Sequence, residues 1–420
     1  MNGEMHRLSN GLRVVAAPMA QVGTTSVGIW VDVGGRHESA DENGVAHMLE
    51  HMAFKGTRRR TARAIAEEIE GVGGYINAYT SREQTAYYAR ALKEDLPLAT
   101  DIIADIVLNS TFPEDELMRE REVVRQEIAQ TQDTPDDLVF DLLQEAAYPD
   151  QAAGRSILGT SERVSRFQRD ELQSFMGRGY DASRMVLAVA GAVDPDEFLQ
   201  LAEERFGAVV EQPAAVPEPA TWQGGALVDD REIEQVHLTL GVDGVAYDDP
   251  DFAAIQVLAG LLGGGMSSRL FQEIREKRGL AYSVFAFAGS MMDGGMFGVY
   301  AATDPDSLPE LQPVLVAELL RTMDDVSDEE VARARSQMKA GLVMSLESSS
   351  ARLEQIARQT LIHGTPQSTA DWLAKVDAVD TAAIRGAARR LFADVTDPAM
   401  AAIGPAAHLD SHAKLLARFR

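Results

Sequence analysis

The sequence predicts an α+β fold of two homologous halves, each an α/β roll in which helices pack on a mostly antiparallel sheet. At 420 residues the chain is long for one hydrophobic core, because domains usually hold about 100–200 residues. The stretch EQPAAVPEPATWQGG, Glu211 to Gly225, has three prolines and two glycines and no periodicity, which is typical of a linker. We therefore expect one domain at residues 1–215 and a second at residues 216–420.

Strand-like runs open each half, and helical runs follow them. The first half begins with LRVVAAPMA at 12–20 and TTSVGIWVDVGG at 24–35, and the second begins with QVHLTLGV at 235–242. The segments TARAIAEEIEGVG at 61–73 and LPLATDIIADIVLNS at 96–110 place apolar residues at intervals of three and four, as an amphipathic helix does. Strands and helices of this kind predict an α+β half.

Two longer stretches match between the halves and indicate an internal duplication. FPEDELMREREVVRQEI from Phe112 and VSDEEVARARSQMKAGL from Val326 share an acidic helix start followed by arginine. Each is preceded by a strand pair that leads into a helix, YINAYTSREQTAYYARALKEDLP in the first half and YSVFAFAGSMMDGGMFGVYAATDPDSLP in the second. Self-similarity at a fixed spacing is typical of a repeated structural unit.

The overall charge argues against a nucleic-acid partner. The formal net charge is −26, whereas a phosphate backbone is bound by clustered lysine and arginine. The one basic cluster, KGTRRR at Lys55 to Arg60, is short, and we expect it to be a solvated loop. An acidic surface can attract basic peptides, or it can simply keep the protein soluble.

Cysteine is absent, which excludes disulfides and thiolate catalysis. Any metal must then be held by His, Asp or Glu. No apolar run reaches the ~18–20 residues that cross a bilayer, and the first residues lack the pattern of a signal peptide. We therefore expect a cytoplasmic protein with no membrane span.

The stretch NGVAHMLEHMAFKGT, from Asn43 to Thr57, predicts a short helix with a functional face. Asn43 is a suitable N-cap, Gly56 a suitable residue after the helix end, and Lys55 would lie in the last turn, where it favours the helix dipole. Such signals at both ends favour a helix of about three turns.

Three polar residues share one face of this helix. His47, Glu50 and His51 stand at relative positions 0, 3 and 4, and two imidazoles one turn apart can bind one Zn²⁺ ion. The alternative is a core helix that buries two histidines. The pattern His-x-x-Glu-His is the inverted form of the zinc-protease helix motif, which favours the metal interpretation.

A third ligand is expected from the helix EDELMREREVVRQEIAQ. Glu120 and Glu127 are seven residues apart, about two turns, so that both carboxylates project from one face. One of the two would bind the metal and the other would lie behind it; alternatively the helix is charged surface. In the matching stretch of the second half, Ala334 and Gly341 stand at these places, so only the first half can hold the metal.

Together these motifs resemble the pitrilysin or M16 family of metallopeptidases, and within it the mitochondrial-processing-peptidase-like branch. The resemblance extends from near residue 6 to near residue 400, with the motifs in family order and at family spacing. The motifs are His47-x-x-Glu50-His51, the pair Glu120 and Glu127, GGYINAYTSREQTAYY from Gly73, and REKRGLAYSV from Arg275.

The resemblance implies a role for each residue of the first half. It makes His47, His51 and Glu127 the ligands of Zn²⁺. Glu50 would be the general base, and Glu120 a carboxylate that orients a ligand histidine. All five positions fit the family pattern, which matters because some relatives keep the fold and lose the zinc residues.

The same resemblance implies how a substrate is held. Arg275 and Tyr282 would bind the substrate backbone or the developing oxyanion. Asn77, Ala78 and Tyr79 would offer a free backbone edge to which a peptide adds as a strand; a plain edge strand is the alternative.

In this family four similar units enclose a chamber, and this chain supplies two. The resemblance therefore implies a homodimer, or a heterodimer with a related chain, that hydrolyses peptides or unfolded, presequence-like segments with Zn²⁺ as its cofactor. Two other functions stay open: a structural or assembly subunit without catalysis, and a maturase dedicated to one precursor peptide.

Overall fold

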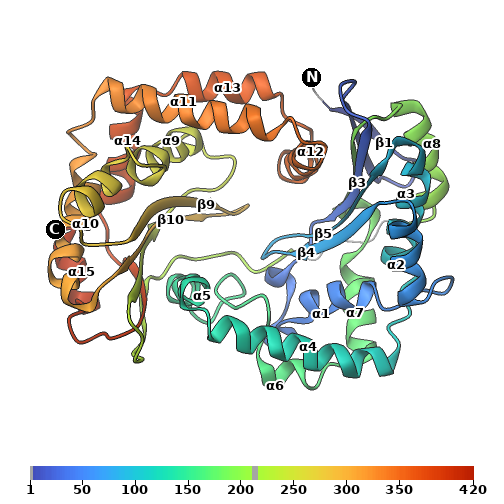
Figure 1. The fold of residues 1–420 in the computed structure, drawn as a ribbon, viewed down its shortest axis with the longest axis horizontal. Coiled ribbons are helices and arrows are strands. Elements are labelled where there is room, and N and C mark those ends of the chain that lie inside the picture. The colour runs from blue at the N-terminus through green and yellow to red at the C-terminus, as the bar shows by residue number, and fades with distance from the viewer. Residues whose placement is uncertain (1–2, 211–215) are drawn as a thin grey trace. The chain divides into compact units, whose positions relative to one another are not determined.

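Two mixed sheets organise the protein, one in each of two compact units (Figure 1). The structure is a computed structural model that describes residues 3–210 and 216–420. Residues 211–215 of the predicted linker, and with them the expected domain boundary, lie outside the described residues. Unit 1 draws on the described parts of Met1–Gln130, Ser156–Glu218 and Val343–Thr369, and unit 2 on Thr131–Arg155, Pro219–Leu342 and Ala370–Arg420.

The sheet of unit 1 has six strands in the order β1-β2-β6-β3-β5-β4. Only β2 and β6 pair in parallel, and all other neighbours are antiparallel. β4 therefore forms one edge of the sheet. The strands are β1 Glu4–Arg7, β2 Arg13–Pro18, β3 Thr24–Val31, β4 Tyr75–Thr80, β5 Thr85–Leu92 and β6 Met185–Gly191.

The sheet of unit 2 repeats this plan in the order β7-β11-β8-β10-β9, again with one parallel pair, β7 and β11. Within residues 216–420, it lacks only an equivalent of β1. The predicted α+β fold with two duplicated halves is confirmed. The strands are β7 Gly225–Asp229, β8 Val236–Asp243, β9 Ser283–Ser290, β10 Gly295–Thr303 and β11 Ala399–Ile403.

Helices cover both faces of the first sheet. One face packs against α1 Val45–Ala53, α3 Leu96–Leu108 and their neighbours, and alternate strand residues such as Val14 and Ile29 point into that core. The other face, with Trp30, is covered by α12 Ser349–His363. The remaining helices of the first half are α2 Ala62–Gly71, α4 Glu114–Gln132, α6 Ser161–Val164, α7 Arg169–Gly179 and α8 Pro195–Phe206.

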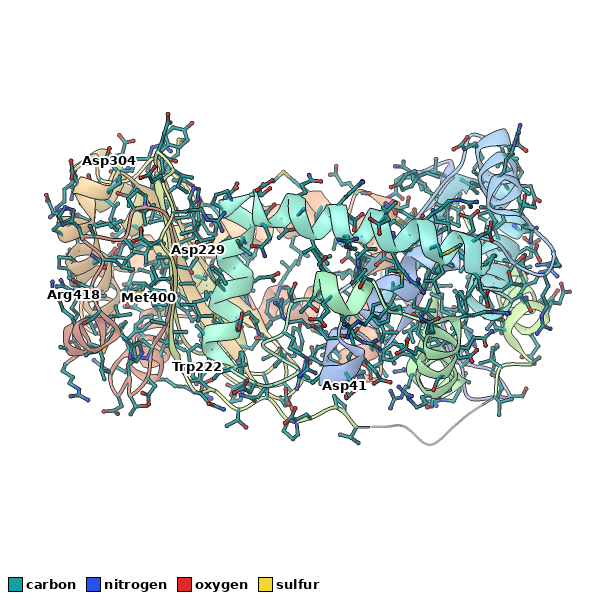
Figure 2. The ribbon with its side chains drawn as sticks, turned by 90° about the horizontal axis from the view of Figure 1, so that it is seen from below. Asp41, Trp222, Asp229, Asp304, Met400 and Arg418 are labelled. Atoms are coloured by element: carbon teal, nitrogen blue, oxygen red, sulfur yellow. The ribbon has the colours of Figure 1, made fainter. Side chains whose placement is uncertain are left out.

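The second sheet is covered in the same way. Met400 of β11, labelled in Figure 2, is buried in a core to which residues of α9 and α14 also contribute. α5 Pro135–Ala147 packs on the opposite face against β8 and β11. The further elements are α9 Phe252–Gly263, the π-helix η5 Phe271–Glu276, α10 Leu308–Arg321, α11 Asp328–Ser345, α13 Thr369–Asp377, α14 Thr381–Phe392 and α15 His412–Arg418. Within the described residues, no helix combines the length and the apolar character that a membrane span requires.

The halves exchange one helix each. α5 follows the first half's sheet strands β1–β5 in sequence but packs on the second sheet, and α12 belongs to the second half but packs on the first sheet. The two stretches that match in sequence form α4 and α11, and each helix begins two residues after its matching stretch starts. Each compact unit is therefore discontinuous in sequence.

The basic cluster after α1 is anchored rather than solvated. Nη2 of Arg60 lies 2.7 Å from Asp101, and its Nη1 lies 2.9 Å from Asp105. The side chain of Arg60 is only 10% exposed, and that of Asp105 is fully buried. The expectation of a solvated loop is wrong for Arg60, because two carboxylates of α3 neutralise it. These ion pairs fasten the chain after α1 to α3.

The loop before α1 contains a half-buried histidine, His37. Nδ1 of His37 accepts a hydrogen bond from the backbone N–H of Gly34 at 3.1 Å, which requires an unprotonated nitrogen. Burial, followed by the positive charges of Arg184 and Arg36, lowers the pKa of His37 to about 4. His37 is therefore neutral in the folded protein at neutral pH.

This pKa predicts a specific sensitivity to acid. The pKa of His37 falls from 6.5 to about 4 on folding, so the unfolded chain binds more protons between these values and stability declines as pH falls through that window. The full shift is worth about 3 kcal/mol at most. We expect His37→Asn, whose amide oxygen can still accept from Gly34, to lose less stability than wild type between pH 7 and pH 4.5.

Urea unfolding midpoints at several pH values measure this difference. The exposed His408 provides a matched control, His408→Asn, which should follow the wild-type curve. Equal acid sensitivity of His37→Asn and wild type would contradict the prediction.

Candidate metal centre

The helix α1 buries one face and presents polar residues on the other. Met48, Leu49 and Met52 are buried in the core of unit 1, which fixes the orientation of the helix. His47, Glu50 and His51 are partly exposed on the remaining face. Because the apolar face of the helix is buried, the three polar residues of the motif lie on its more exposed face.

The two ends of α1 differ from the sequence-based expectation. The N-cap is Gly44, with φ of +91°, and not Asn43. The side chain of Asn43 donates to Glu38 and to the carbonyl of Ser156, so it does not accept from the helix. The carboxylate of Glu38 accepts from the helix N–H groups instead. The prediction that Asn43 caps the helix is wrong, because the upstream residue Glu38 supplies the hydrogen-bond acceptor.

At its other end α1 finishes at Ala53, with Phe54 as the C-cap. Lys55 therefore lies beyond the last turn, and its expected place inside that turn is wrong. Its Nζ lies 2.7 Å from Oε1 of Glu120 on α4. Gly56 follows with φ of +128°, a conformation that favours glycine.

Helix α4 carries the two glutamates on one side, as expected. Glu120 is buried at 5% exposure between Leu117 and Val124, which pack into the same core as α1. The side chain of Glu127 is 38% exposed. The two carboxylates thus stand in different environments, although their spacing gives them the same face.

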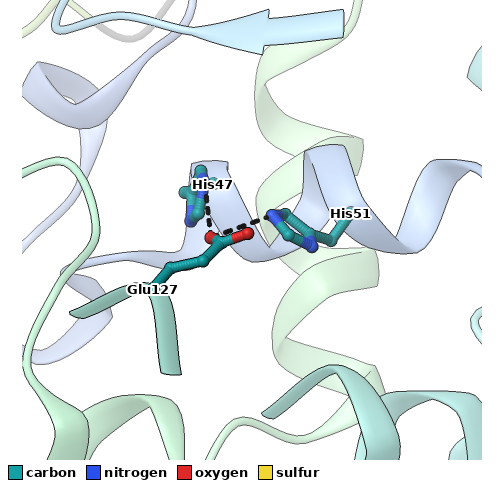
Figure 3. A group of neighbouring side chains, drawn as sticks. All are labelled: His47, His51 and Glu127. Atoms are coloured by element: carbon teal, nitrogen blue, oxygen red, sulfur yellow. Dashed lines mark ion pairs between the residues drawn. The ribbon is translucent and has the colours of Figure 1, made fainter. Parts of the chain in front are cut away.

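His47, His51 and Glu127 converge on one point (Figure 3). Oε2 of Glu127 lies 3.7 Å from Nε2 of His47 and 3.4 Å from Nε2 of His51. The potential ligand atoms of the three residues lie within 4.8 Å of one another. Across the described residues this is the sole group of three or more His, Asp or Glu side chains with such spacing. Two imidazoles and one carboxylate fit a divalent zinc ion.

The two histidines differ in their protonation. Burial and the nearby His51 lower the pKa of His47 to about 3, so His47 offers a lone pair at neutral pH. Burial alone would lower the pKa of His51, but its hydrogen bond to Glu120 and the charges of neighbouring glutamates raise it. Nδ1 of His47 is buried without a hydrogen-bond partner among the described residues. A cation at the convergence point would be held through Nε2 of each histidine, and Nδ1 of His47 would take no part in binding it.

Glu120 lies behind His51 and does not reach the convergence point. Its Oε2 is 2.9 Å from Nδ1 of His51, while Oε1 contacts Lys55. Burial would raise the pKa of Glu120, but the contacts to His51 and Lys55 lower it overall. A carboxylate that accepts from Nδ1 fixes the tautomer of the imidazole and directs Nε2 outward.

Glu50 lies beside the cluster without joining it. Burial raises the pKa of Glu50, and the charge of Glu127 acts in the same direction. Thr80 at the end of β4 and the nearby His51 partly oppose this rise. A carboxylate with a raised pKa close to a metal site is suited to accept and return a proton.

The residues expected to hold a peptide lie on β4. β4 pairs only with β5 in the sheet, so its other side is an edge. The side chain of Ala78 faces the core that contains α1. Tyr79 points to the opposite face, where its hydroxyl accepts from Nε1 of Trp30 at 3.0 Å. Asn77 donates to the hydroxyl of Tyr75.

Arg275 and Tyr282 belong to unit 2 and contact each other. Arg275 is the second-last residue of η5, and Tyr282 immediately precedes β9. The guanidinium carbon of Arg275 lies 5.2 Å from the ring centre of Tyr282 and 4.8 Å from that of Phe271. The side chain of Tyr282 is 73% exposed. The pair is therefore accessible to a ligand and ordered by cation–π contacts.

The sequence did not predict three residues that surround the cluster. Glu38 accepts from the start of α1, Lys55 contacts Glu120, and Thr80 acts to lower the pKa of Glu50. The spacing of residues in a sequence predicts which side chains share one helix face. It does not predict contacts between separate segments of the chain, such as these. Only Lys55, next to the motif and of opposite charge to Glu120, carries a signal that could have been used.

Comparison with known proteins places the whole chain in one group. A family model described as "Insulinase (Peptidase family M16)" matches residues 13–161, and one described as "Peptidase M16 inactive domain" matches residues 166–338. A protein of Rickettsia bellii described as an uncharacterized zinc protease is 40% identical over 408 residues, covering 96% of this chain and 98% of its own length.

Two further relatives agree. A probable mitochondrial-processing peptidase subunit beta of Arabidopsis thaliana is 38% identical and covers 98% of this chain and 80% of its own. A protease from Helicobacter pylori has a solved structure that matches with a TM-score of 0.89 at 24% identity, covering 96% of this chain and 99% of its own. The resemblance stated from the motifs is confirmed, and the structural match supports the fold.

The contact between Glu120 and His51 predicts a measurable titration. Because Glu120 raises the pKa of His51 through a hydrogen bond and its charge, Glu120→Gln should lower that pKa in the metal-free protein. Proton–carbon NMR of the histidine rings measures the change, and His51→Asn assigns the signal. An unchanged titration of His51 in Glu120→Gln would show that the contact is not formed in solution.

Proposed function

Since this chain belongs to peptidase family M16, we propose that it is a zinc-dependent endopeptidase that cleaves peptides or unfolded, presequence-like segments. The family and its relatives support a metallopeptidase with zinc as the cofactor. The convergence of His47, His51 and Glu127 within 4.8 Å is the observation that supports specific residues for the proposed activity. Relatives that lack catalysis need no such cluster.

In this proposal the three side chains hold the metal through Nε2 of His47, Nε2 of His51 and a carboxylate oxygen of Glu127. When bound, zinc supplies a Lewis acid that polarises the peptide carbonyl and lowers the pKa of a water molecule. Glu120 keeps the proton on Nδ1 of His51, which leaves the lone pair of Nε2 for binding. His47 binds as the neutral imidazole that its low pKa favours.

Glu50 moves the proton in the proposed reaction. Its carboxylate accepts a proton from the attacking water and returns it to the amine nitrogen of the leaving peptide. Its raised pKa suits this role, because it makes the carboxylate a stronger base than an exposed glutamate.

The peptide would be held by the edge of the first sheet. A substrate strand adding to β4 would use the backbone at Asn77, Ala78 and Tyr79. Arg275 and Tyr282 would hold the substrate backbone or donate to the oxygen on which negative charge develops.

We further propose that the active protein is a dimer whose chamber is formed by two chains, with Arg275 and Tyr282 acting at the site of the partner subunit. A heterodimer with a related chain is the variant suggested by the processing-peptidase relative. The cytoplasmic location expected from the sequence, and a substrate limited to one precursor, stay predictions.

A first experiment tests the proposed base. Glu50→Gln should lower the hydrolysis of a quenched basic peptide by at least about 100-fold, because it removes general-base catalysis and leaves the three metal-binding side chains in place. Elemental analysis should still find zinc. Glu67→Gln, on an exposed glutamate of α2, is the matched control and should keep full activity. Unchanged hydrolysis by Glu50→Gln, or by chelator-treated wild type, would refute the proposal.

A second experiment tests the shared site. Glu50→Gln protein and Arg275→Ala/Tyr282→Phe protein should each be inactive alone. Mixed under subunit exchange, they should recover about a quarter of wild-type activity, because half of the dimers are mixed and half of their sites are complete. Mixing Glu50→Gln with His47→Asn should recover nothing. Absence of recovery in the first mixture, with exchange verified by mass spectrometry, would indicate sites complete within one chain.

A further inference from the structure

Glu38 lies outside every motif and is 3% exposed, yet its carboxylate closes the start of the metal helix. Oε2 accepts from the backbone N–H of Gly44 at 2.8 Å, and Oε1 accepts from that of Ala46 at 2.8 Å. The side-chain amide of Asn43 adds a third hydrogen bond at 3.1 Å. We propose that Glu38 is a positioning residue of the metal site, which sets the metal affinity by fixing where α1 begins.

The position of Glu38 is favourable for this role. Unpaired N–H groups at a helix N-terminus carry a partial positive charge, and a buried carboxylate is stabilised only when such donors surround it. The acceptor comes from eight residues before Ala46, so the bond ties two separate segments rather than capping locally. Replacing the carboxylate would leave two N–H groups unsatisfied in a buried place.

The other side of the helix start is closed by backbone. A Cβ on Gly44 would lie 2.8 Å from the carbonyl oxygen of Leu158 and 2.9 Å from Cα of Gly159. The amide of Asn43 also donates to the carbonyl of Ser156 at 2.9 Å. The 156–159 loop restricts movement of the helix start on one side, and the hydrogen bonds of Glu38 restrain it on the other. Together these contacts fix the position of the first turn.

The first turn matters because it contains His47, the third residue of the helix. α1 has nine residues, which is too short to be stable without its surroundings. A small shift of its start would move Nε2 of His47 away from Glu127, while Glu120 and Lys55 hold His51 at the opposite end. Glu38 therefore acts on the metal through His47 and touches neither metal nor substrate.

The test compares zinc affinity in two matched variants of the full-length protein, and it rests on the metal site of the proposed function. Glu38→Gln keeps the shape of the side chain and removes its charge. Asp194→Asn makes the same change at the cap of α8, where Asp194 accepts from Asp196 and Glu197 at 3.0 Å and 3.2 Å. Both metal-free proteins are first checked for folding by thermal unfolding, and zinc is then titrated against a chromophoric chelator.

We expect Glu38→Gln to weaken zinc binding by at least about tenfold, as changes to groups that orient metal ligands do, and Asp194→Asn to leave it unchanged. The visible spectrum of the cobalt-substituted protein should change only in Glu38→Gln. A folded Glu38→Gln protein with wild-type affinity overturns the inference, and so does an equal loss in Asp194→Asn.

Should Glu38→Gln fail to fold, Glu38→Asp decides the question. Aspartate keeps the charge but is one methylene too short to reach both N–H groups, so zinc binding should again weaken. Wild-type affinity of Glu38→Asp would overturn the inference. Wild-type protein that binds no zinc would instead refute the proposed metal site, which separates the two failures.

Discussion

The hydrophobic core to which α1 and α4 both contribute is the constraint on which the site depends. Both helices bury apolar residues in one core, Met48 and Met52 from α1 and Leu117 and Val124 from α4. This shared core places the two histidines opposite Glu127, although 75 residues separate His51 from Glu127 in the sequence. Burying the apolar side chains contributes several kcal/mol, far more than a partly exposed contact between Glu127 and a histidine could. The apolar contacts therefore assemble the site, and the polar groups specify what it binds.

Environment then assigns different tasks to similar side chains. Glu120 and Glu127 lie on one helix face, but Glu120 is buried and held by Lys55 and His51, whereas Glu127 keeps its oxygens near Nε2 of both histidines. Glu50 has neither kind of partner, and burial shifts its proton affinity upward. The spacing of the three glutamates in the sequence could not predict these different roles, because the roles depend on how deeply each carboxylate is buried and on which side chains contact it.

The extent of successful prediction follows the same division. The duplicated α+β plan, the metal helix and the two glutamates of α4 were predicted from the sequence, since each depends on residues a few positions apart. The choice between Glu120 and Glu127 came only with the family resemblance. The cap at Glu38 and the ion pairs of Arg60 were missed or misjudged, because they depend on how distant segments meet. Asn43 shows that a suitable capping residue does not cap the helix when a buried carboxylate from another segment accepts from the N–H groups.

The exchange of α5 and α12 has a consequence for how the protein is made on the ribosome. The face of the first sheet that carries Val15, Trp30 and Val186 is completed by Leu353 and Ile356 of α12. These are translated well after β6 ends at Gly191, a delay of roughly 10–30 s at ordinary elongation rates. Throughout that interval a nascent chain displays an uncovered surface that carries Trp30, and we expect this surface to be open to aggregation or to a chaperone until α12 is made.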